Sequence, residues 1–98
     1  MIRSFSGSGV EDVFNGADTK RARKACPTLL WNVARRKLEL LDSARALNDL
    51  RAPPANRLEA MKGDRAGQHS IRVNAQYRIC FIWTLDGPEH VEIVDYHS

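Results

Sequence analysis

The spacing of apolar residues changes along the chain, from a helical period in the first half to alternation in the second. Apolar positions three and four residues apart at 10–14 predict one or two helical turns. A longer series with the same spacing follows Pro27, which suits a first helical turn, and predicts the main helix as far as Ala44. The apolar stripe of this helix consists of Leu30, Val33, Ala34, Leu38 and Leu41, and its water-facing side of Arg35, Arg36 and Glu39.

Five segments are predicted to be strands, most clearly where apolar and polar residues alternate. They are Ile2–Phe5, Arg57–Met61, Ser70–Asn74, Tyr77–Trp83 and His90–Tyr96. The polar and basic stretch 16–24 is expected to be a loop, and Pro53 with Pro54 is expected to forbid helix and favour an extended segment. Turns are expected at Lys62–Arg65 and Asp86–Pro88.

The order of these elements predicts a single α+β domain over residues 1–98, a length that fits one hydrophobic core. An N-terminal strand and two helices are expected to pack on one face of the sheet. Because hairpin-connected strands dominate the second half, the sheet is expected to be mainly antiparallel. The other face is then free to carry a functional site.

The distribution of charge is more informative than its net value of +3, which is too small to indicate a nucleic-acid partner. The basic residues between positions 61 and 78 are Lys62, Arg65, Arg72 and Arg78, against the single acidic residue Asp64. The last twenty residues contain four acidic residues and neither lysine nor arginine. Charge alone is equally consistent with a solvated basic face and with an anion-binding one.

Several classes of protein are disfavoured by the sequence. No apolar run approaches the roughly 20 residues that span a bilayer, and the N-terminus lacks the apolar core of a secretory signal. The expected location is therefore the cytoplasm, with no membrane partner. Cys26 and Cys80 match neither a metal-binding nor a redox spacing, so two reduced thiols are expected.

The candidate chemistry lies in the second half of the chain. We find no phosphate-cradling glycine loop, no dinucleotide fingerprint and no metal-ligand spacing among the histidines, which favours chemistry without metal or cofactor. If the last two strands form a hairpin, Arg78 lies near Tyr96 and His97. Cleavage of RNA by 2′-hydroxyl attack needs such a set of cations and proton-transferring groups. Taken singly, Lys62 and Arg78 are more often surface charges and Tyr96 is more often a half-buried strand residue. A penultimate histidine, here His97, is more often part of a frayed end.

Longer motifs show a resemblance to a known family. The segments Pro53–Asn74, Tyr77–Phe81 and Val91–His97, with the opening Met1–Phe5 and the helical Arg36–Asp42, resemble the HigB-type toxins, a branch of the RelE superfamily. The elements K-G-D-R-x-G, S-I-x-V, Y-R-I and D-Y-H are together quite specific. The similarity covers nearly the whole chain except the stretch 16–24.

This resemblance implies a compact domain with a curved antiparallel sheet, whose concave side receives messenger RNA in the ribosomal A site. It implies that Lys62 and Arg78 stabilise phosphate charge. It also implies that Asp95, Tyr96 and His97 supply proton transfer and positioning near the scissile bond, without assigning the acid or the base.

The same resemblance implies that RNA or ribosome contacts come from Arg65, Arg72, His69 and Asn74. Some relatives have a second arginine where this chain has Asn74. Arg72 lies two residues earlier, and it either compensates for that arginine or binds ribosomal RNA. His69 is polar where some relatives carry an aromatic residue, so a base-stacking contact is expected to differ.

The expected function is that of a ribosome-dependent, metal-independent endoribonuclease of a type II toxin–antitoxin pair. The implied partner is a HigA-type antitoxin with a helix-turn-helix domain, which alone would contact operator DNA. The alternative is a toxin-like module that binds RNA or the ribosome without cutting, or that acts as a corepressor.

Overall fold

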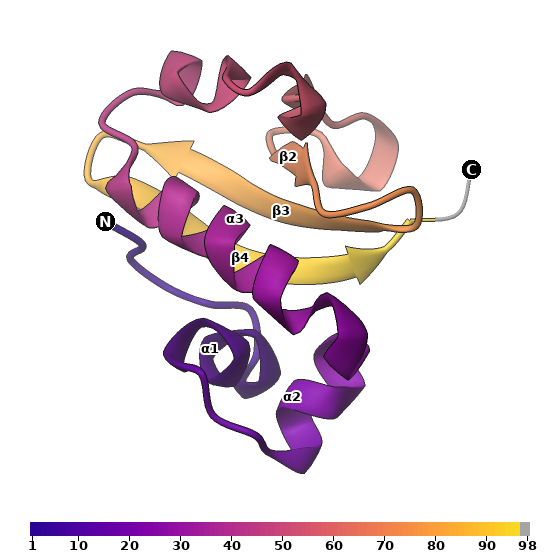
Figure 1. The fold of residues 1–98 in the computed structure, drawn as a ribbon. Coiled ribbons are helices and arrows are strands. Elements are labelled where there is room, and N and C mark those ends of the chain that lie inside the picture. The colour runs from indigo at the N-terminus through magenta and orange to yellow at the C-terminus, as the bar shows by residue number, and fades with distance from the viewer. Residues whose placement is uncertain (97–98) are drawn as a thin grey trace.

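The computed structural model describes residues 1–96 and shows helices packed on a four-stranded sheet (Figure 1). The α-helices are α1 (Ser8–Asn15), α2 (Lys20–Ala25) and α3 (Trp31–Ser43). The strands are β1 (Glu59–Ala60), β2 (His69–Arg72), β3 (Tyr77–Thr84) and β4 (Gly87–Asp95). Short 3-10 turns occupy Thr28–Leu30, Leu47–Arg51, Pro54–Asn56 and Gly63–Arg65.

The sheet is antiparallel throughout, with the strand order β1-β2-β3-β4. Helix α3 crosses one face of this sheet, and α1 packs against α2, α3 and β4 (Figure 1). The predicted α+β class is therefore confirmed. Because consecutive strands form hairpins, the start of β3 lies beside the end of β4, where Tyr77 pairs with Asp95.

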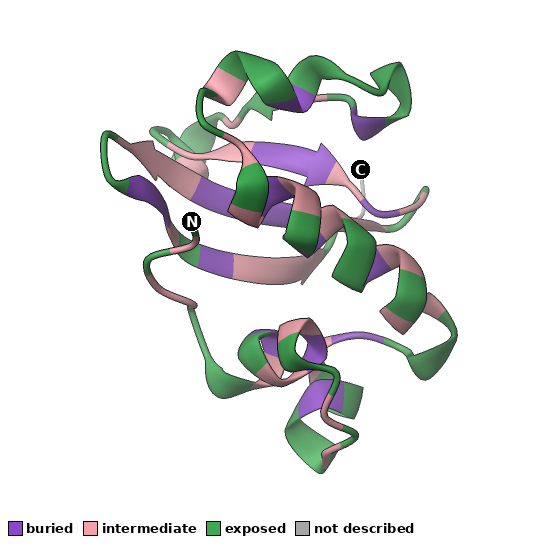
Figure 2. Ribbon diagram, turned by 60° about the vertical axis from the view of Figure 1, so that its left-hand side comes forward, coloured by how far each residue is buried: buried purple, intermediate pink, exposed green. Residues whose placement is uncertain are grey.

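The core forms where the apolar stripe of α3 meets the sheet. Leu38 and Leu41 from α3, and Ile79, Phe81 and Val91 from the strands, are fully buried (Figure 2). Arg35, Arg36 and Glu39 are exposed, as the helical period predicted.

Replacing Leu38 by alanine is expected to cost about 2–5 kcal/mol of unfolding free energy, because it leaves a cavity at the centre of this contact. Urea unfolding measures the loss. Arg36→Ala, on the exposed side of the same helix, is the control. A loss no larger than that of the control would contradict this orientation of the helix.

The N-terminal segment is extended but forms less regular pairing than predicted for Ile2–Phe5. It makes one isolated parallel bridge, Phe5 with Val91, although the Arg3 amide also donates to the Pro88 carbonyl over 2.8 Å. The strand β4 contains a register shift nearby, where His90 adopts a φ of +53°. This irregularity limits how far a neighbouring strand can follow β4.

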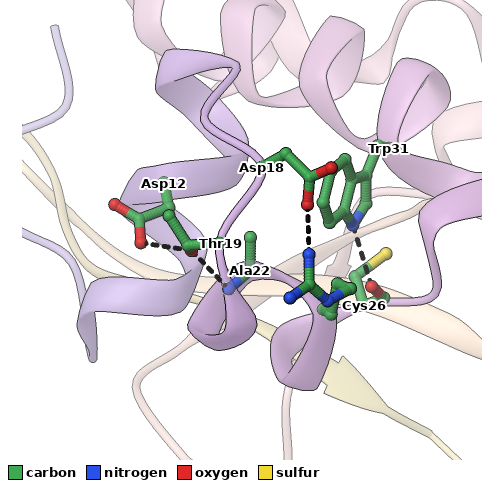
Figure 3. Close-up of polar contacts among 7 residues, drawn as sticks. Asp12, Asp18, Thr19, Ala22, Cys26 and Trp31 are labelled. Atoms are coloured by element: carbon green, nitrogen blue, oxygen red, sulfur yellow. Dashed lines mark hydrogen bonds and ion pairs between the residues drawn. The ribbon is translucent and has the colours of Figure 1, made fainter.

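The basic stretch 16–24 was expected to be a loop, which is right for 16–19 and wrong for 20–24, because α2 begins at Lys20. The Thr19 hydroxyl oxygen accepts a hydrogen bond from the Ala22 amide at 3.0 Å, which caps the helix (Figure 3). The same hydroxyl donates to the Asp12 carboxylate of α1 at 2.7 Å. Only Ala22 of this helix is buried, so its sequence has no apolar stripe that periodicity could detect.

The extended segment predicted at the paired prolines is found at Ala52 and Pro53 but ends there. Pro54 begins a 3-10 turn that ends at Asn56, which a proline tolerates because its missing amide lies in the first turn. The buried Asn56 amide nitrogen donates to the Leu50 and Ala52 carbonyls, each at 3.2 Å, and fixes the turn.

Two boundaries on the strands also differ from prediction. The strand expected over Arg57–Met61 contracts to Glu59–Ala60, because Arg57 has a left-handed φ of +47°. The turn expected at Asp86–Pro88 occupies Leu85 and Asp86 instead, since Gly87 already pairs with Thr84 in β4. Gly87 suits that position because its φ is +127° and an added Cβ would lie 2.1 Å from the Met1 carbonyl oxygen.

Both cysteines are buried free thiols, as predicted. Burial raises the pKa of Cys26 to about 11 and also raises the pKa of Cys80. Within residues 1–96, no helix has the length and apolar character that crossing a membrane requires.

We expect both thiols to resist iodoacetamide in the folded protein, because alkylation needs an accessible thiolate. In the unfolded chain each thiol has its ordinary pKa, so the folded state binds these protons more tightly. The free energy of unfolding therefore decreases as the pH rises from the ordinary thiol range toward about 11 for Cys26. Labelling with and without denaturant at mildly alkaline pH tests this, and equal rates would refute it.

Candidate active site

The antiparallel register divides the residues of β2 and β3 between the two faces of the sheet. Ile71 pairs with Ile79, and both are buried on the face that α3 covers. Arg72 pairs with Arg78, so their side chains leave the sheet on the face opposite α3. We call this the outer face.

Arg78 is held in place by three neighbours on the outer face. Its Nη1 donates to the Ser70 hydroxyl at 3.2 Å, and its Nη2 lies 3.4 Å from the Glu59 Oε1. The guanidinium carbon lies 5.1 Å from the centre of the Tyr96 ring, a cation–π arrangement. The side chain is only 14% exposed, whereas that of Glu59 is 52% exposed. The expected proximity of Arg78 and Tyr96 is therefore confirmed.

Arg72 has a different environment from its cross-strand partner. It is half-buried, and across residues 1–96 its side chain has neither a hydrogen bond nor an ion pair. Like charges directly opposite on adjacent strands destabilise a sheet. Within residues 1–96, the outer face thus carries two arginines at paired positions, one with an internal counterion and one without.

Arg65 reaches the outer face from the 3-10 turn before β2. Its Nη1 lies 2.7 Å from the Glu92 Oε1 of β4 and 3.1 Å from the Gln68 Oε1. The hydrogen bond with Glu92 raises the pKa of Arg65 further. Glu92 is the register partner of Cys80, so the ion pair of Arg65 with Glu92 lies over the middle of the outer face. The charge of Arg65 is already neutralised within the protein.

Asn74 and His69 do not join the two arginines. The Asn74 Oδ1 accepts hydrogen bonds from the Gln76 and Tyr77 amides, at 2.9 and 2.7 Å, and so shapes the turn between β2 and β3. His69 pairs with Phe81 and lies on the face that α3 covers, with the two ring centres 6.4 Å apart.

The remaining predicted site residues lie at the loop before β2 and at the end of β4. Lys62 is exposed and directly precedes the turn Gly63–Arg65. Asp95 accepts a hydrogen bond from the Gln76 side chain at 3.1 Å, and the Tyr96 amide donates to the Gln76 carbonyl. His97 lies outside the described residues. The end of β4 is thus anchored at the start of β3, where Tyr96 contacts Arg78. Asp95 is the register partner of Tyr77 and belongs by alternation to the face of Ile79.

Sequence reasoning missed three residues of this site: Glu59, Ser70 and Glu92. Ser70 had a detectable signal, because it is a small polar residue in a strand at the alternation period of Arg72. Glu59 had none, because its place depends on the pairing of a two-residue strand. Among residues 1–96, no group of three or more histidine, cysteine, aspartate or glutamate side chains could hold a metal ion.

A small antiparallel sheet with helices on one face and paired arginines on the other defines a compact α+β protein with a basic site. The family model described as the RelE-like toxin of the type II toxin–antitoxin system HigB matches residues 3–97. The chain therefore belongs to the HigB-like toxin family, and membership implies an antitoxin partner.

Two relatives are similar to this chain, and one of them is a HigB toxin by name. The chain is 48% identical to Toxin HigB-1 of Vibrio cholerae over 98 residues. The aligned residues make up 100% of this chain and 99% of that protein. It is 44% identical over 55 residues to an uncharacterized protein of Haemophilus influenzae, covering 56% of this chain and 54% of that protein.

Proposed function

We propose that this protein is a ribosome-dependent endoribonuclease that cleaves messenger RNA in the ribosomal A site and so inhibits translation. The observation that supports this proposal most directly is the pairing of Arg72 with Arg78 on the outer face, where Arg78 lies over the Tyr96 ring. The chain that carries this site belongs to the HigB-like family. Two adjacent cations next to a stacking aromatic ring suit a single-stranded RNA backbone and its bases.

The proposed reaction is a transesterification. The 2′-oxygen attacks the adjacent phosphorus, the bond from phosphorus to the 5′-oxygen breaks, and the products are a 2′,3′-cyclic phosphate and a 5′-hydroxyl. A base takes the 2′-hydroxyl proton and an acid protonates the leaving oxygen.

The residues are assigned to this reaction by their chemistry. Lys62 and Arg78 stabilise the negative charge that develops on the phosphorane. Asp95, Tyr96 and His97 transfer protons and position the scissile bond, without an individual assignment of acid and base. The ring of Tyr96 also keeps the Arg78 guanidinium in one orientation, which supports its role as a preorganised donor.

The proposed partners follow from the same assignment. A HigA-type antitoxin with a helix-turn-helix domain neutralises the toxin, and operator DNA is contacted through that antitoxin. The ribosome supplies the messenger in an extended, single-stranded form that reaches the outer face.

Primer extension on a reporter messenger, with and without ribosomes, tests the proposal. Cleavage within the translated region that requires ribosomes would support it. An intact messenger under blocked translation would instead favour a non-catalytic ribosome-binding module. Equal cleavage of naked RNA would contradict the dependence on ribosomes.

We expect cleavage to survive chelation of transition metals at constant magnesium, because the proposed proton-transfer and charge-stabilising groups all come from side chains. The measurement is the cleavage rate on programmed ribosomes before and after chelation. Loss of cleavage that added zinc or manganese restores would show that the mechanism is wrong.

A further inference from the structure

Within residues 1–96, the paired arginines Arg72 and Arg78 of the outer face carry two positive charges against one carboxylate, that of Glu59. Arg72 and Arg78 are direct partners in the β2–β3 register, and within residues 1–96 Arg72 lacks any anionic contact. Such a pair costs stability unless an anion lies between the two charges. A like-charged pair with one carboxylate for two charges indicates a ligand with negative charge.

Glu59 supplies half of that missing charge, and it does so weakly. It lies on the two-residue edge strand β1, its side chain is 52% exposed, and it meets Arg78 at 3.4 Å. An ion pair whose carboxylate is largely exposed contributes little, so another anion can displace Glu59 from Arg78. A phosphate group presents its oxygens to a guanidinium much as a carboxylate does, and it carries more of them.

We propose that one RNA phosphate bridges Arg72 and Arg78 and takes the place of Glu59, which is the internal counterion of Arg78 in the free protein. This inference rests on the proposed function, because the phosphate is that of the messenger. Arg72 then becomes a second phosphate-binding residue, and Glu59 weakens RNA binding by competing for Arg78.

In the proposed phosphate site, the cation beside Arg78 is Arg72 of β2, because the side chain of Asn74 is used in the turn before β3. The Asn74 Oδ1 is occupied by the Gln76 and Tyr77 amides, so this residue maintains the turn. An arginine side chain has no carbonyl oxygen for that purpose. Arg72, on the strand itself, is the register partner of Arg78 on the outer face.

Binding of a 2′-O-methylated RNA hexamer, followed by NMR titration, tests the inference without cleavage. The informative variants are Arg72→Gln and Glu59→Gln. Their controls are Arg36→Gln, an exposed arginine of α3, and Glu39→Gln, a 61% exposed carboxylate that meets Arg35 at 3.7 Å. The same spectra show whether each variant is folded.

Arg72→Gln is expected to weaken binding by about tenfold, the effect of losing a charge-assisted hydrogen bond. It should also lower the slope of log K against log salt by about 0.7, as loss of one phosphate contact to single-stranded RNA does. Arg72→Lys should keep the slope. Glu59→Gln is expected to tighten binding by about two- to fivefold, since it removes the competing anion.

Three results would overturn the inference: no binding of the hexamer by the wild type, an Arg72→Gln variant equal to its control, or weaker binding by Glu59→Gln. The last would mean that Glu59 positions Arg78 and does not compete with phosphate. If the hexamer binds as expected and ribosomes still show no messenger cleavage, the phosphate site stands and the proposed ribonuclease fails.

Discussion

Replacing Arg78 by glutamine is expected to slow messenger cleavage on ribosomes by roughly 100- to 1,000-fold, the usual effect of removing one preorganised charge-stabilising donor. The reason is geometric. Ser70, Glu59 and the Tyr96 ring hold the guanidinium in one orientation on the outer face. Single-turnover cleavage of a reporter on programmed ribosomes measures the effect.

The fold should survive this replacement. The partner Glu59 is largely exposed, so loss of the ion pair is expected to cost at most about 1 kcal/mol. Arg78→Lys keeps the charge but loses the planar fork, so it should restore only part of the rate. Arg36→Gln on α3 is the matched control. An Arg78→Gln variant that cleaves at a rate within about threefold of wild type would show that Arg78 is not a catalytic residue.

His97→Ala is expected to lower the cleavage rate by about 100- to 10,000-fold, the range for loss of a positioned acid or base. This expectation comes from the D-Y-H element and from the contact of its Tyr96 ring with the Arg78 guanidinium. If His97 acts in catalysis and not in folding, the thermal midpoint stays unchanged.

The control for this variant is Ser98→Ala, at the neighbouring position. Both variants should still bind the antitoxin, which reports on folding in the same preparation. Cleavage by His97→Ala at the rate of the Ser98→Ala control would place proton transfer on other residues.

The sequence predicted the elements that bury a regular apolar pattern. The stripe of α3 and the alternation of β2 and β3 each repeat for long enough to be recognised, and both were confirmed. Helix α2 was missed because it buries only Ala22, and its one clear signal is the cap at Thr19. The strand β1 was predicted too long because nothing in its pattern indicates the left-handed backbone of Arg57.

The candidate site was predictable where it depends on a single hairpin. Pairing the last two strands was enough to bring Arg78 to Tyr96, and the structure confirms that proximity. The contact with Glu59 was not predictable, because it joins strands separated by β2 and depends on two registers at once. His69 is separated from the arginines because successive residues of β2 point to opposite faces of the sheet. A prediction of its face therefore depends on placing the strand to within one residue.

The chemical nature of the ends left on the messenger is the most direct measurement of the proposed activity. A reporter is translated in the presence of the purified protein, and the fragments are analysed by mass spectrometry. Attack by the 2′-hydroxyl at the outer face predicts a 2′,3′-cyclic phosphate upstream and a 5′-hydroxyl downstream of each cut. A 3′-hydroxyl with a 5′-phosphate, or an uncut messenger on arrested ribosomes, would contradict it.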